Sequence, residues 1–411
     1  MLIPLIQLVR QPLSRLPELI IYSPRKMLLD SLLEALFRFN WRCFVMGEPR
    51  CIVEVDGQIV MPEDINESDV DNTLYMAADT FNVTITNDDL KSDWFRKKQQ
   101  VKVYYGYVDN PAKWYLSDLT HVHTGMIDGV QPKWGRQNGK IVEIIGRDYS
   151  APMIDTQNSY AFTNWVSSDI ANYFAEKYNL KPIITPTSTP VTSDVYQSKQ
   201  EWEALQTCAA REGFVCYVTK DLELYFGPRQ ESDDNIVDTL SVIGLGLSTD
   251  DMSFDDSGVG VYNKVTVLHY YKKQLIQGSA QNDQLISSMG GQIVEKVMTD
   301  SKATTPAIAN QLAANFLHEY SRQAITCTFN NLPGNPLYIA EKKIQVVDAG
   351  RFSSPYYIEE AKHTYGKQSG YTVSISGTNI RPDDADQYKQ DLYNKDKYDV
   401  TSGSYVPKGT I

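Results

Sequence analysis

Apolar and polar residues alternate in short runs between residues 47 and 156, the period of strands with one buried face. The alternation is clearest in Phe81–Thr86. In Cys51–Val60 two such runs flank an Asp-Gly pair, which supplies the positive-φ residues of a tight hairpin turn. Asn138-Gly139 has the same role between Val122–Trp134 and Lys140–Gly146, so we expect those two runs to pair. The pattern predicts an antiparallel barrel or sandwich ending near residue 156.

Helical periodicity appears after residue 160. Trp165–Asn179 places its apolar residues on one face, with Ser167 or Ser168 as the expected cap. Ser198-Lys199-Gln200-Glu201 has the form of a capping box and opens a second helix. Gly213 is suited to end that helix, and two short β runs, Phe214–Thr219 and Leu222–Phe226, then predict a hairpin.

A second β-rich stretch follows an acidic, glycine-rich interval. We interpret 233–260 as a linker, because it is rich in Asp and Gly. Beyond it, Thr305-Pro306 predicts the start of a helix, since threonine caps well and proline fits the first turn. Further strands are predicted at Val261–Tyr270, Ile325–Asn330, Lys343–Val347 and Tyr356–Ile375.

The fold class expected from these elements is mainly β with α/β insertions: two antiparallel barrels and a small α/β domain. The predicted segments are an N-terminal helical extension (1–46), a first barrel (47–160), a helix–hairpin α/β domain (161–232), an acidic linker (233–260), a second barrel with a helix (261–380) and a polar tail (381–411). The tail has almost no large aliphatic residues, so we expect it to order only on a partner.

Residues 1–46 differ from the rest in charge, with six basic residues against three acidic ones. Ser23-Pro24 predicts a helix over Pro24–Phe39 with a charged stripe and a leucine-rich remainder. This helix either docks on a partner or membrane surface, or packs on its own domain. A third possibility is that the natural start is Met46.

Composition narrows the functional classes. The 411 residues carry a net charge of −12, which argues against a duplex-binding protein that displaces counterions with a basic stripe. The five cysteines have no C-x-x-C spacing, so we expect assembly in a reducing compartment. No apolar run reaches the length of a spanning helix.

Motifs for chemistry are weak throughout the chain. His121-x-His123 lacks a third ligand at a recognisable spacing, and Gly244-Leu-Gly246 and Gly258-Val-Gly260 do not complete a phosphate loop. Asp250-Asp251 and Asp255-Asp256 lack the ligand pattern of a calcium loop. Ordinary strand histidines, loop glycines and solvated acids are the favoured interpretations.

Glu359-Glu360 resembles a hydrolase acid pair only superficially, because neighbours on a strand point to opposite faces. We therefore interpret the pair as structural surface. There is no G-x-S-x-G or H-E-x-x-H motif. We expect no catalytic, cofactor-binding or metal-binding residues and no cofactor, hence a protein that is not an enzyme.

Seven short motifs follow one another along the chain. They are Val101-x-Val103-x-x-Gly106, Thr124-Gly125-x-Ile127-x-x-Val130, Gly146-Arg147-Asp148-x-x-Ala151-x-x-Ile154-Asp155, Trp202-x-x-Leu205-x-x-x-Ala209-x-Arg211-Glu212-Gly213-Phe214, Asp221-Leu222-x-Leu224-Tyr225-Phe226, Tyr262-Asn263-x-Val265-x-Val267 and Thr372–Gly377. Their order resembles the late-control protein D family, the baseplate hub proteins of contractile phage tails. The similarity covers roughly 50–378 and departs from the family in the first 46 residues and at Lys220-Asp221, where an Asp-Gly turn is common.

This resemblance implies a homotrimeric structural protein of the virion. Each subunit would contribute two tube-like barrels, so that a three-fold ring presents a pseudo-six-fold face. The ring would be a symmetry adaptor between the tail tube protein above and the central spike protein below, beside other baseplate proteins. DNA would only pass through its lumen, membranes would not be bound stably, and assembly would take place in the host bacterial cytoplasm. The acidic composition would suit such a lumen.

Two other functional classes remain open from the sequence. One is a tail-associated peptidoglycan hydrolase, which zymography would reveal. The other is a receptor- or carbohydrate-binding tail module, which predicts tyrosines and tryptophans clustered in a surface groove.

Overall fold

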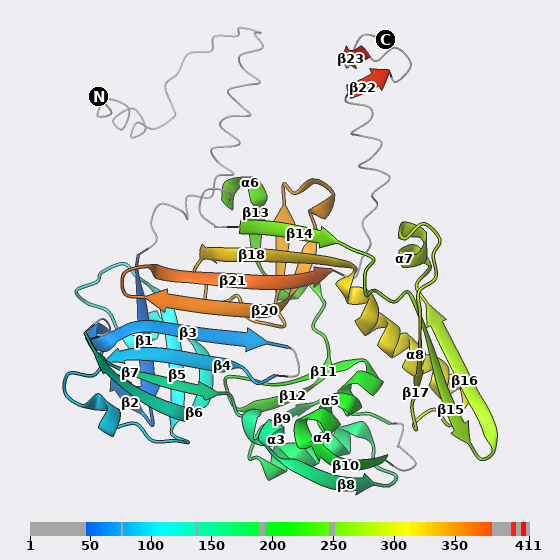
Figure 1. Ribbon diagram of the computed structural model, residues 1–411, viewed down its shortest axis with the longest axis horizontal. Helices are drawn as coiled ribbons and strands as arrows, with labels where there is room; N and C mark the ends of the chain where they lie inside the picture. The colour runs from blue at the N-terminus through cyan, green and yellow to red at the C-terminus, as the bar shows by residue number, and fades with distance from the viewer. Residues whose placement is uncertain are drawn as a thin grey trace, which may run out of the picture. The chain divides into compact units, whose positions relative to one another are not determined.

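The computed structural model describes residues 47–74, 77–136, 139–188, 194–245, 251–379, 396–399 and 404–407 (Figure 1). About half of them lie in strands, most of which pair antiparallel, which confirms the mainly β prediction. The predicted extension over 1–46 lies outside the described residues. No helix in the described part of the chain is long and apolar enough to cross a bilayer.

One thirteen-stranded sheet dominates the fold. Its first half is formed by β1 (Glu48–Val55), β2 (Gln58–Val60), β3 (Ile65–Thr73), β4 (Thr80–Thr86), β5 (Gln100–Val108), β6 (Thr120–Gly135) and β7 (Gly139–Arg147). Its second half is formed by β13 (Ile236–Ser241), β14 (Asp251–Asp256), β18 (Ile325–Pro333), β19 (Lys343–Val347), β20 (Pro355–Gly366) and β21 (Gly370–Asn379).

The two halves are joined by the antiparallel pairing of β3 with β20, in which Val70 lies opposite His363. The strand order is β14-β18-β21-β20-β3-β4-β7-β6-β5-β1-β2, with β19 also beside β20 and β13 beside β19. β3 was not among the predicted strands, although it is the link between the halves. Figure 1 shows β20 and β3 side by side across the middle of the sheet.

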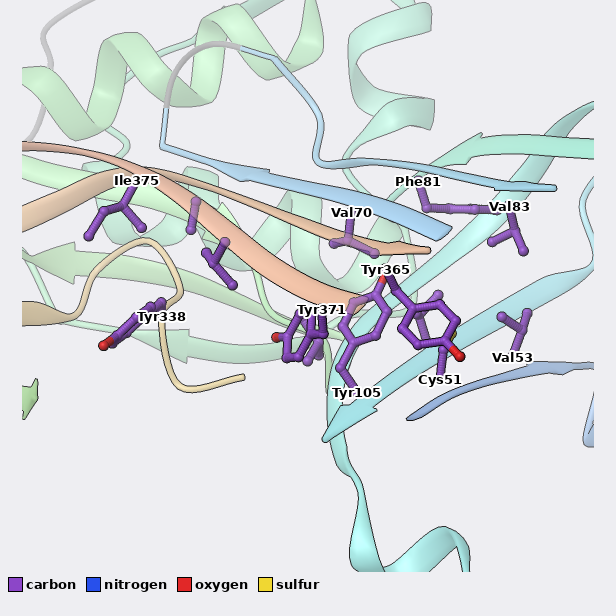
Figure 2. Packing of buried hydrophobic residues seen from close by; sticks show 14 of the residues in the cluster. Cys51, Val53, Val70, Phe81, Val83, Tyr105, Tyr338, Tyr365, Tyr371 and Ile375 are labelled. Atoms are coloured by element: carbon purple, nitrogen blue, oxygen red, sulfur yellow. The ribbon is translucent and has the colours of Figure 1, made fainter. Parts of the chain in front are cut away.

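A single apolar core lies on one side of this sheet and serves both halves. Tyr105 from β5 stacks on Tyr371 from β21, with ring centroids 4.9 Å apart. Tyr105 is fully buried, and Val70 of β3 and Ile375 of β21 belong to the same cluster. Figure 2 shows these side chains converging from β3, β5 and β21. The two expected barrels therefore share one core rather than forming two separate ones.

The smaller α/β region follows β7 and has its own core, which includes Phe174, Leu205 and Phe226. Gly213 ends α5 with a positive φ of 69°, as predicted. The predicted hairpin is confirmed as β11 paired with β12. The region consists of α3 (Ala151–Asp155), β8 (Gln157–Phe162), α4 (Ser167–Lys177), β9 (Lys181–Ile184), β10 (Asp194–Gln200), α5 (Glu201–Glu212), β11 (Phe214–Val218) and β12 (Glu223–Pro228).

Both predicted serine caps in this region are wrong. The N-cap of α4 is Val166, and Ser167 instead donates a hydrogen bond to Glu212 at 2.5 Å. The capping box at 198–201 does not form, because Ser198 has a positive φ of 49° and the N-cap of α5 is Gln200. Glu201 is buried and accepts from Lys177 at 2.6 Å. Ser167 and Glu201 thus bind residues distant in the sequence instead of capping the nearby helix ends.

The interval predicted as a linker, 233–260, contains two strands of the large sheet. β13 pairs with β19, and β14 pairs with β18 from Asp251–Asn330 to Asp256–Ile325. Within β14, Met252 and Phe254 pack against the core while the acids face away from it. The linker prediction failed because an edge strand with one solvated face can be highly acidic.

The segment predicted as the second barrel, 261–380, divides between two structures. Val265 and Val267 pack on α8, which starts at Thr305-Pro306 as predicted. This separate sheet and its helices are β15 (Lys264–Tyr271), β16 (Gln274–Gln281), α7 (Asp283–Ser288), β17 (Glu295–Thr299) and α8 (Pro306–Ser321). The strands from β18 onward belong to the large sheet.

The remaining elements are short. In the predicted tail, β22 (Asp396–Asp399) pairs with β23 (Ser404–Pro407), and the rest of 381–411 lies outside the described residues. The others are α6 (Val242–Leu245) and the 3-10 turns η3 (Pro62–Asp64), η4 (Lys91–Asp93), η5 (Leu116–Asp118), η6 (Asp233–Asn235), η7 (Arg322–Ala324) and η8 (Gly350–Phe352).

Candidate functional site

The side of the large sheet that faces away from the core is polar across both halves. Strand alternation places every second residue on this side. The register then aligns these residues in rows that cross the junction, with Lys362 opposite Asp71 and Asp71 opposite Thr80. We call this surface the polar sheet face.

Hydroxyl, amide and acidic side chains make up most of the polar sheet face. Carboxylates outnumber cations on it, and Ile141 and Ile145 are its apolar members. The polar members are Asp251, Ser253, Asp255, Thr326, Thr328, Asn330, Thr372, Ser374, Ser376, Glu360, Lys362, Thr364, Glu67, Asp69, Asp71, Thr80, Asn82, Thr84, Glu143 and Arg147. These side chains include no aromatic ring on which a base could stack.

The cations on the polar sheet face are occupied by neighbouring acids. Arg147 binds Asp128 at 2.6 Å and Asp155 at 2.7 Å. Lys362 lies beside Asp71, where burial raises the pKa of the carboxyl and Lys362 opposes that rise. A shallow depression of about 460 Å³ lies between these groups. Such a surface should bind a polyanion weakly, because carboxylates already lie beside its cations.

Two strands at the ends of the polar sheet face have a free edge. β14 pairs only with β18 among the described strands. β6 pairs with β5 as far as Met126, but from Gly129 to Gly135 its described partner is β7 alone. Pro132 lies in this free stretch, where its missing N–H costs no ladder bond. The edges differ in charge, since β14 carries Asp251 and Asp255 and β6 carries Lys133.

A buried ionic cluster lies where β20 meets α8 and the α/β region. Glu359 is 5% exposed and accepts from Arg322 at 3.1 Å and Arg229 at 3.3 Å. Both guanidinium groups lie over the Tyr357 ring, at 4.7 and 5.3 Å from its centroid. Interpreting Glu359 as surface was wrong, because Arg322, Arg229 and the Thr378 hydroxyl bind its carboxyl and cover it.

The other candidate residues are engaged in packing, hydrogen bonds or ion pairs within the protein. His121 bonds the Thr124 hydroxyl at 2.8 Å, whereas His123 is buried against Phe81, with ring centroids 5.6 Å apart. Burial lowers the pKa of His123 to about 3. Asp256 pairs with Arg351 at 2.6 Å. The described residues contain no cluster of His, Cys, Asp and Glu that could hold a metal ion.

The described cysteines are not placed to act as nucleophiles. Gly246 and Asp250 lie outside the described residues. Cys51, Cys208, Cys216 and Cys327 are buried thiols without a disulfide, and desolvation raises the pKa of Cys51 to about 12. A thiol held protonated is a poor nucleophile. The feature that distinguishes the described part of the chain is therefore a surface, the polar sheet face with its two free edges.

Comparison of the fold with solved structures finds phage tail proteins. The tail protein from Neisseria meningitidis MC58 is 15% identical with a TM-score of 0.63, over 81% of this chain and 97% of that one. The 43 kDa tail protein of prophage MuSo2 from Shewanella oneidensis is 14% identical with a TM-score of 0.60, over 81% and 98%. These likenesses show that the chain has the fold of phage tail proteins.

A third similar structure comes from a secretion machine. It is an E. coli protein described as a component of the type VI secretion system with structural similarity to bacteriophage T4 tail proteins. It is 10% identical with a TM-score of 0.50, over 79% of this chain and 76% of that one. No protein-family model matches the sequence, and no curated protein matches it.

Proposed function

We propose that this chain, which has the fold of phage tail proteins, is the structural baseplate hub of a contractile tail. In this role three copies form a ring between a six-fold tail tube and a three-fold central spike, and the polar sheet face lines the channel. The observation that carries the proposal is the continuity of that face across both halves of the sheet, ending at two free edges.

The two halves of the sheet would let a ring of three chains match both a six-fold and a three-fold partner. In the strand order, β14-β18-β21-β20 from the second half precede β3-β4-β7-β6 from the first. Three copies therefore present six such four-stranded units, alternating between the two kinds. A six-fold tube can dock on six similar units, while the chain remains three-fold for the spike. A continuous core between the halves would hold their relative positions fixed.

The free edges give the ring a means of closing. A head-to-tail interface closes when rotation from copy to copy returns to the start. We place β14 of one copy against the 129–135 stretch of β6 in the next copy, which would continue the sheet. Asp251 and Asp255 would then face Arg136 and Lys133, the latter paired with Glu143 of its own chain, so two acids would meet two cations at the joined edges. The pairing would also cover edges that otherwise invite aggregation.

The polar sheet face suits transit of DNA without binding. Its excess of carboxylates repels phosphate, and its Ser, Thr and Asn side chains keep the surface of the channel hydrated. A lumen potential calculated for the assembled ring should therefore be negative. A positive potential would remove this part of the proposal.

The chain acts as a virion component rather than as an enzyme in this proposal. Its partners would be the tail tube protein, the spike protein and other baseplate proteins, after assembly in the host cytoplasm. Glu359, one of the two acids considered for the hydrolase alternative, is buried and bound by two arginines, so a substrate has no access to its carboxyl.

Light scattering of the purified chain tests the proposal. We expect the mass of three chains, and a complex of three chains with three copies of a candidate spike protein after mixing. Reversal of the edge charge in Lys133→Glu should reduce the trimer fraction, and adding Asp255→Lys should restore it. The exposed Lys113→Glu is the matched control. A monomeric wild type that also remains monomeric with the spike would contradict the proposal.

A further inference from the structure

Two loops of the large sheet each expose a large apolar side chain. Residues 87–99 connect β4 to β5, and residues 334–342 connect β18 to β19. Trp94 in the first loop is 59% exposed, and Leu337 in the second is 51% exposed. Each is followed directly by an aromatic residue of the shared core, Phe95 or Tyr338. Single exposed apolar residues are common on protein surfaces, so what matters here is the relationship between the two.

The same backbone hydrogen bonds hold the end of each loop. Lys98 and Glu341 lie three residues after the buried aromatic residue and have positive φ angles of 72° and 73°. The Lys98 N–H donates to the Ile127 carbonyl oxygen at 2.7 Å, and the Glu341 N–H donates to the Ile358 carbonyl oxygen at 3.1 Å. The N–H groups of the two isoleucines donate back to the next residue of each loop, at 3.0 and 2.8 Å.

The strand pairing beside the two loops is repeated as well. Ile127 of β6 lies opposite Gly146 of β7, and Ile358 of β20 lies opposite Gly377 of β21. A register shift follows each isoleucine. The two loops therefore occupy equivalent positions in the two halves of the sheet, and their exposed apolar residues correspond to each other.

Both loops are fixed by polar contacts, so their exposed side chains have defined positions. Asn87 is fully buried, and its side-chain oxygen accepts from the Ser92 N–H at 2.9 Å. In the second loop the side-chain oxygen of Asn335 accepts from the Leu337 N–H at 3.0 Å. Tyr338, next to Leu337, is 3% exposed. A rigid loop loses little conformational entropy when it binds a partner.

The two loops leave the sheet at the same edge. The path from β18 to β4 runs through β21, β20 and β3, and each of its four pairings is antiparallel. Because an even number of antiparallel steps restores the direction, β4 and β18 run the same way. Their C-terminal ends, from which the loops start, therefore lie at one edge.

The loops would also be evenly spaced around the proposed ring. Four strand steps separate β18 from β4 within one chain. From β4 the path continues through β7 and β6, crosses to β14 of the next copy and reaches its β18, which is again four steps. At about 4.8 Å per step, a loop would recur about every 19 Å along the joined sheet. Three copies would then carry six exposed apolar side chains on one rim, with Trp94 and Leu337 alternating.

We propose that Trp94 and Leu337 form the surface on which the first ring of a six-fold tail tube docks. This inference rests on the proposed function, because it requires the three-copy ring. A three-fold spike could engage only one kind of loop in equivalent contacts and would leave the other exposed. A six-fold partner can offer one apolar pocket to each of the six loops. The docking surface is continuous with the joined sheet, so ring closure and tube docking would support each other.

Co-sedimentation with assembled tubes of the tail tube protein from the same particle tests this surface. We expect Trp94→Asp and Leu337→Asp each to weaken binding of the full-length trimer at least about tenfold, because each carboxylate would enter an apolar pocket. The mass by light scattering and the binding of a candidate spike protein should stay at the wild-type level. Tyr115→Asp is the matched control, since Tyr115 is 61% exposed in the loop from β5 to β6, which leaves the opposite edge.

Three results would overturn this docking surface while leaving the trimer in place. One is a wild-type trimer that does not bind the tube. The second is wild-type binding by both variants, and the third is a loss of spike binding instead of tube binding. Trp94→Ala and Leu337→Ala decide the matter without an added charge if an Asp variant does not fold. A chain that is monomeric in light scattering, with and without the spike, would overturn the proposed function and this surface with it.

Discussion

Tyr105 and Tyr371 stack on each other across the two halves of the sheet, and the Tyr105 hydroxyl bonds Ser68 at 2.8 Å. These contacts join β5, β21 and β3, which lie far apart in the sequence. The halves are therefore parts of one cooperative unit rather than independent domains. The proposed hub would need this rigidity, because its two kinds of docking surface must keep a fixed spacing.

Truncating that contact should destabilise both halves together. We expect Tyr105→Ala to lower the free energy of unfolding by about 3–5 kcal/mol, as for a fully buried aromatic residue. Urea unfolding should remain a single transition for the large sheet when followed by hydrogen exchange in β4 and β18. Tyr115→Ala, at a side chain that is 61% exposed, is the control. Loss of protection in one half alone would contradict a shared core.

The buried ionic cluster gives a second prediction. Arg322→Ala would remove one of the two arginines that bind the buried Glu359 and leave Arg229 as its remaining cation, so we expect a loss of about 3 kcal/mol in urea unfolding. Arg351→Ala removes an arginine from a solvated pair with Asp256 and should cost at most about 1 kcal/mol. Equal effects of the two substitutions would show that the cluster does not stabilise the junction.

Gly146 on β7 predicts a severe steric effect. A Cβ at this position would overlap the Met126 carbonyl oxygen and the Phe81 ring, so Gly146→Ala should reduce soluble yield and lower the melting temperature by several degrees. Gly135 has open space around its Cβ position, and Gly135→Ala should leave the melting temperature within about a degree of wild type. A tolerated Gly146→Ala would mean that β6 and β7 are not packed as described.

Stability should depend on pH through the buried imidazole of His363. Its Nε2 lies 2.8 Å from the Tyr338 carbonyl oxygen and its Nδ1 lies 2.7 Å from the Tyr371 hydroxyl, an arrangement that suits the neutral ring. Desolvation lowers the pKa of His363 to about 4. The unfolded chain binds this proton more readily, so stability is lost as pH falls from about 6.5 towards 4.

Replacement of His363 should therefore remove part of the acid sensitivity. Relative to its own value at pH 7, the wild type should lose about 2 kcal/mol more than His363→Gln by about pH 5. Urea unfolding at the two pH values measures this difference. An equal slope in His363→Gln would contradict the buried neutral imidazole.

Local patterns predicted the parts of the fold that local interactions determine. The turn at Asp56 and Gly57 forms with both residues at positive φ, and Gly213 ends its helix as expected. The predicted pairing of Val122–Trp134 with Lys140–Gly146 is confirmed as β6 and β7, although Asn138 itself lies outside the described residues. In each case the deciding interactions lie within a few residues.

Long-range pairing explains what the sequence patterns missed. β14 carries its acids on the solvated face, so only the alternation of Met252 and Phe254 marked it as a strand. β3 is polar on its outer face and buries Ser68 on its inner face, so its sequence lacks the regular apolar alternation that would predict a central strand. Glu359 is buried by Arg229 and Arg322, which lie far from it in the sequence, so no local motif predicts its burial. The polar sheet face could not be predicted because it requires the register of strands from both halves.

Cross-linking of the two free edges tests the ring most directly. Ser253→Cys on β14 and Gln131→Cys on β6 place thiols on neighbouring copies of the proposed ring, while the four described natural cysteines are buried. With a short bismaleimide, the double variant should give dimers and then trimers as its largest product on a denaturing gel, and neither single variant should. Absence of cross-linked dimers, or a ladder continuing beyond three chains, would contradict closure of a three-copy ring through β14 and β6.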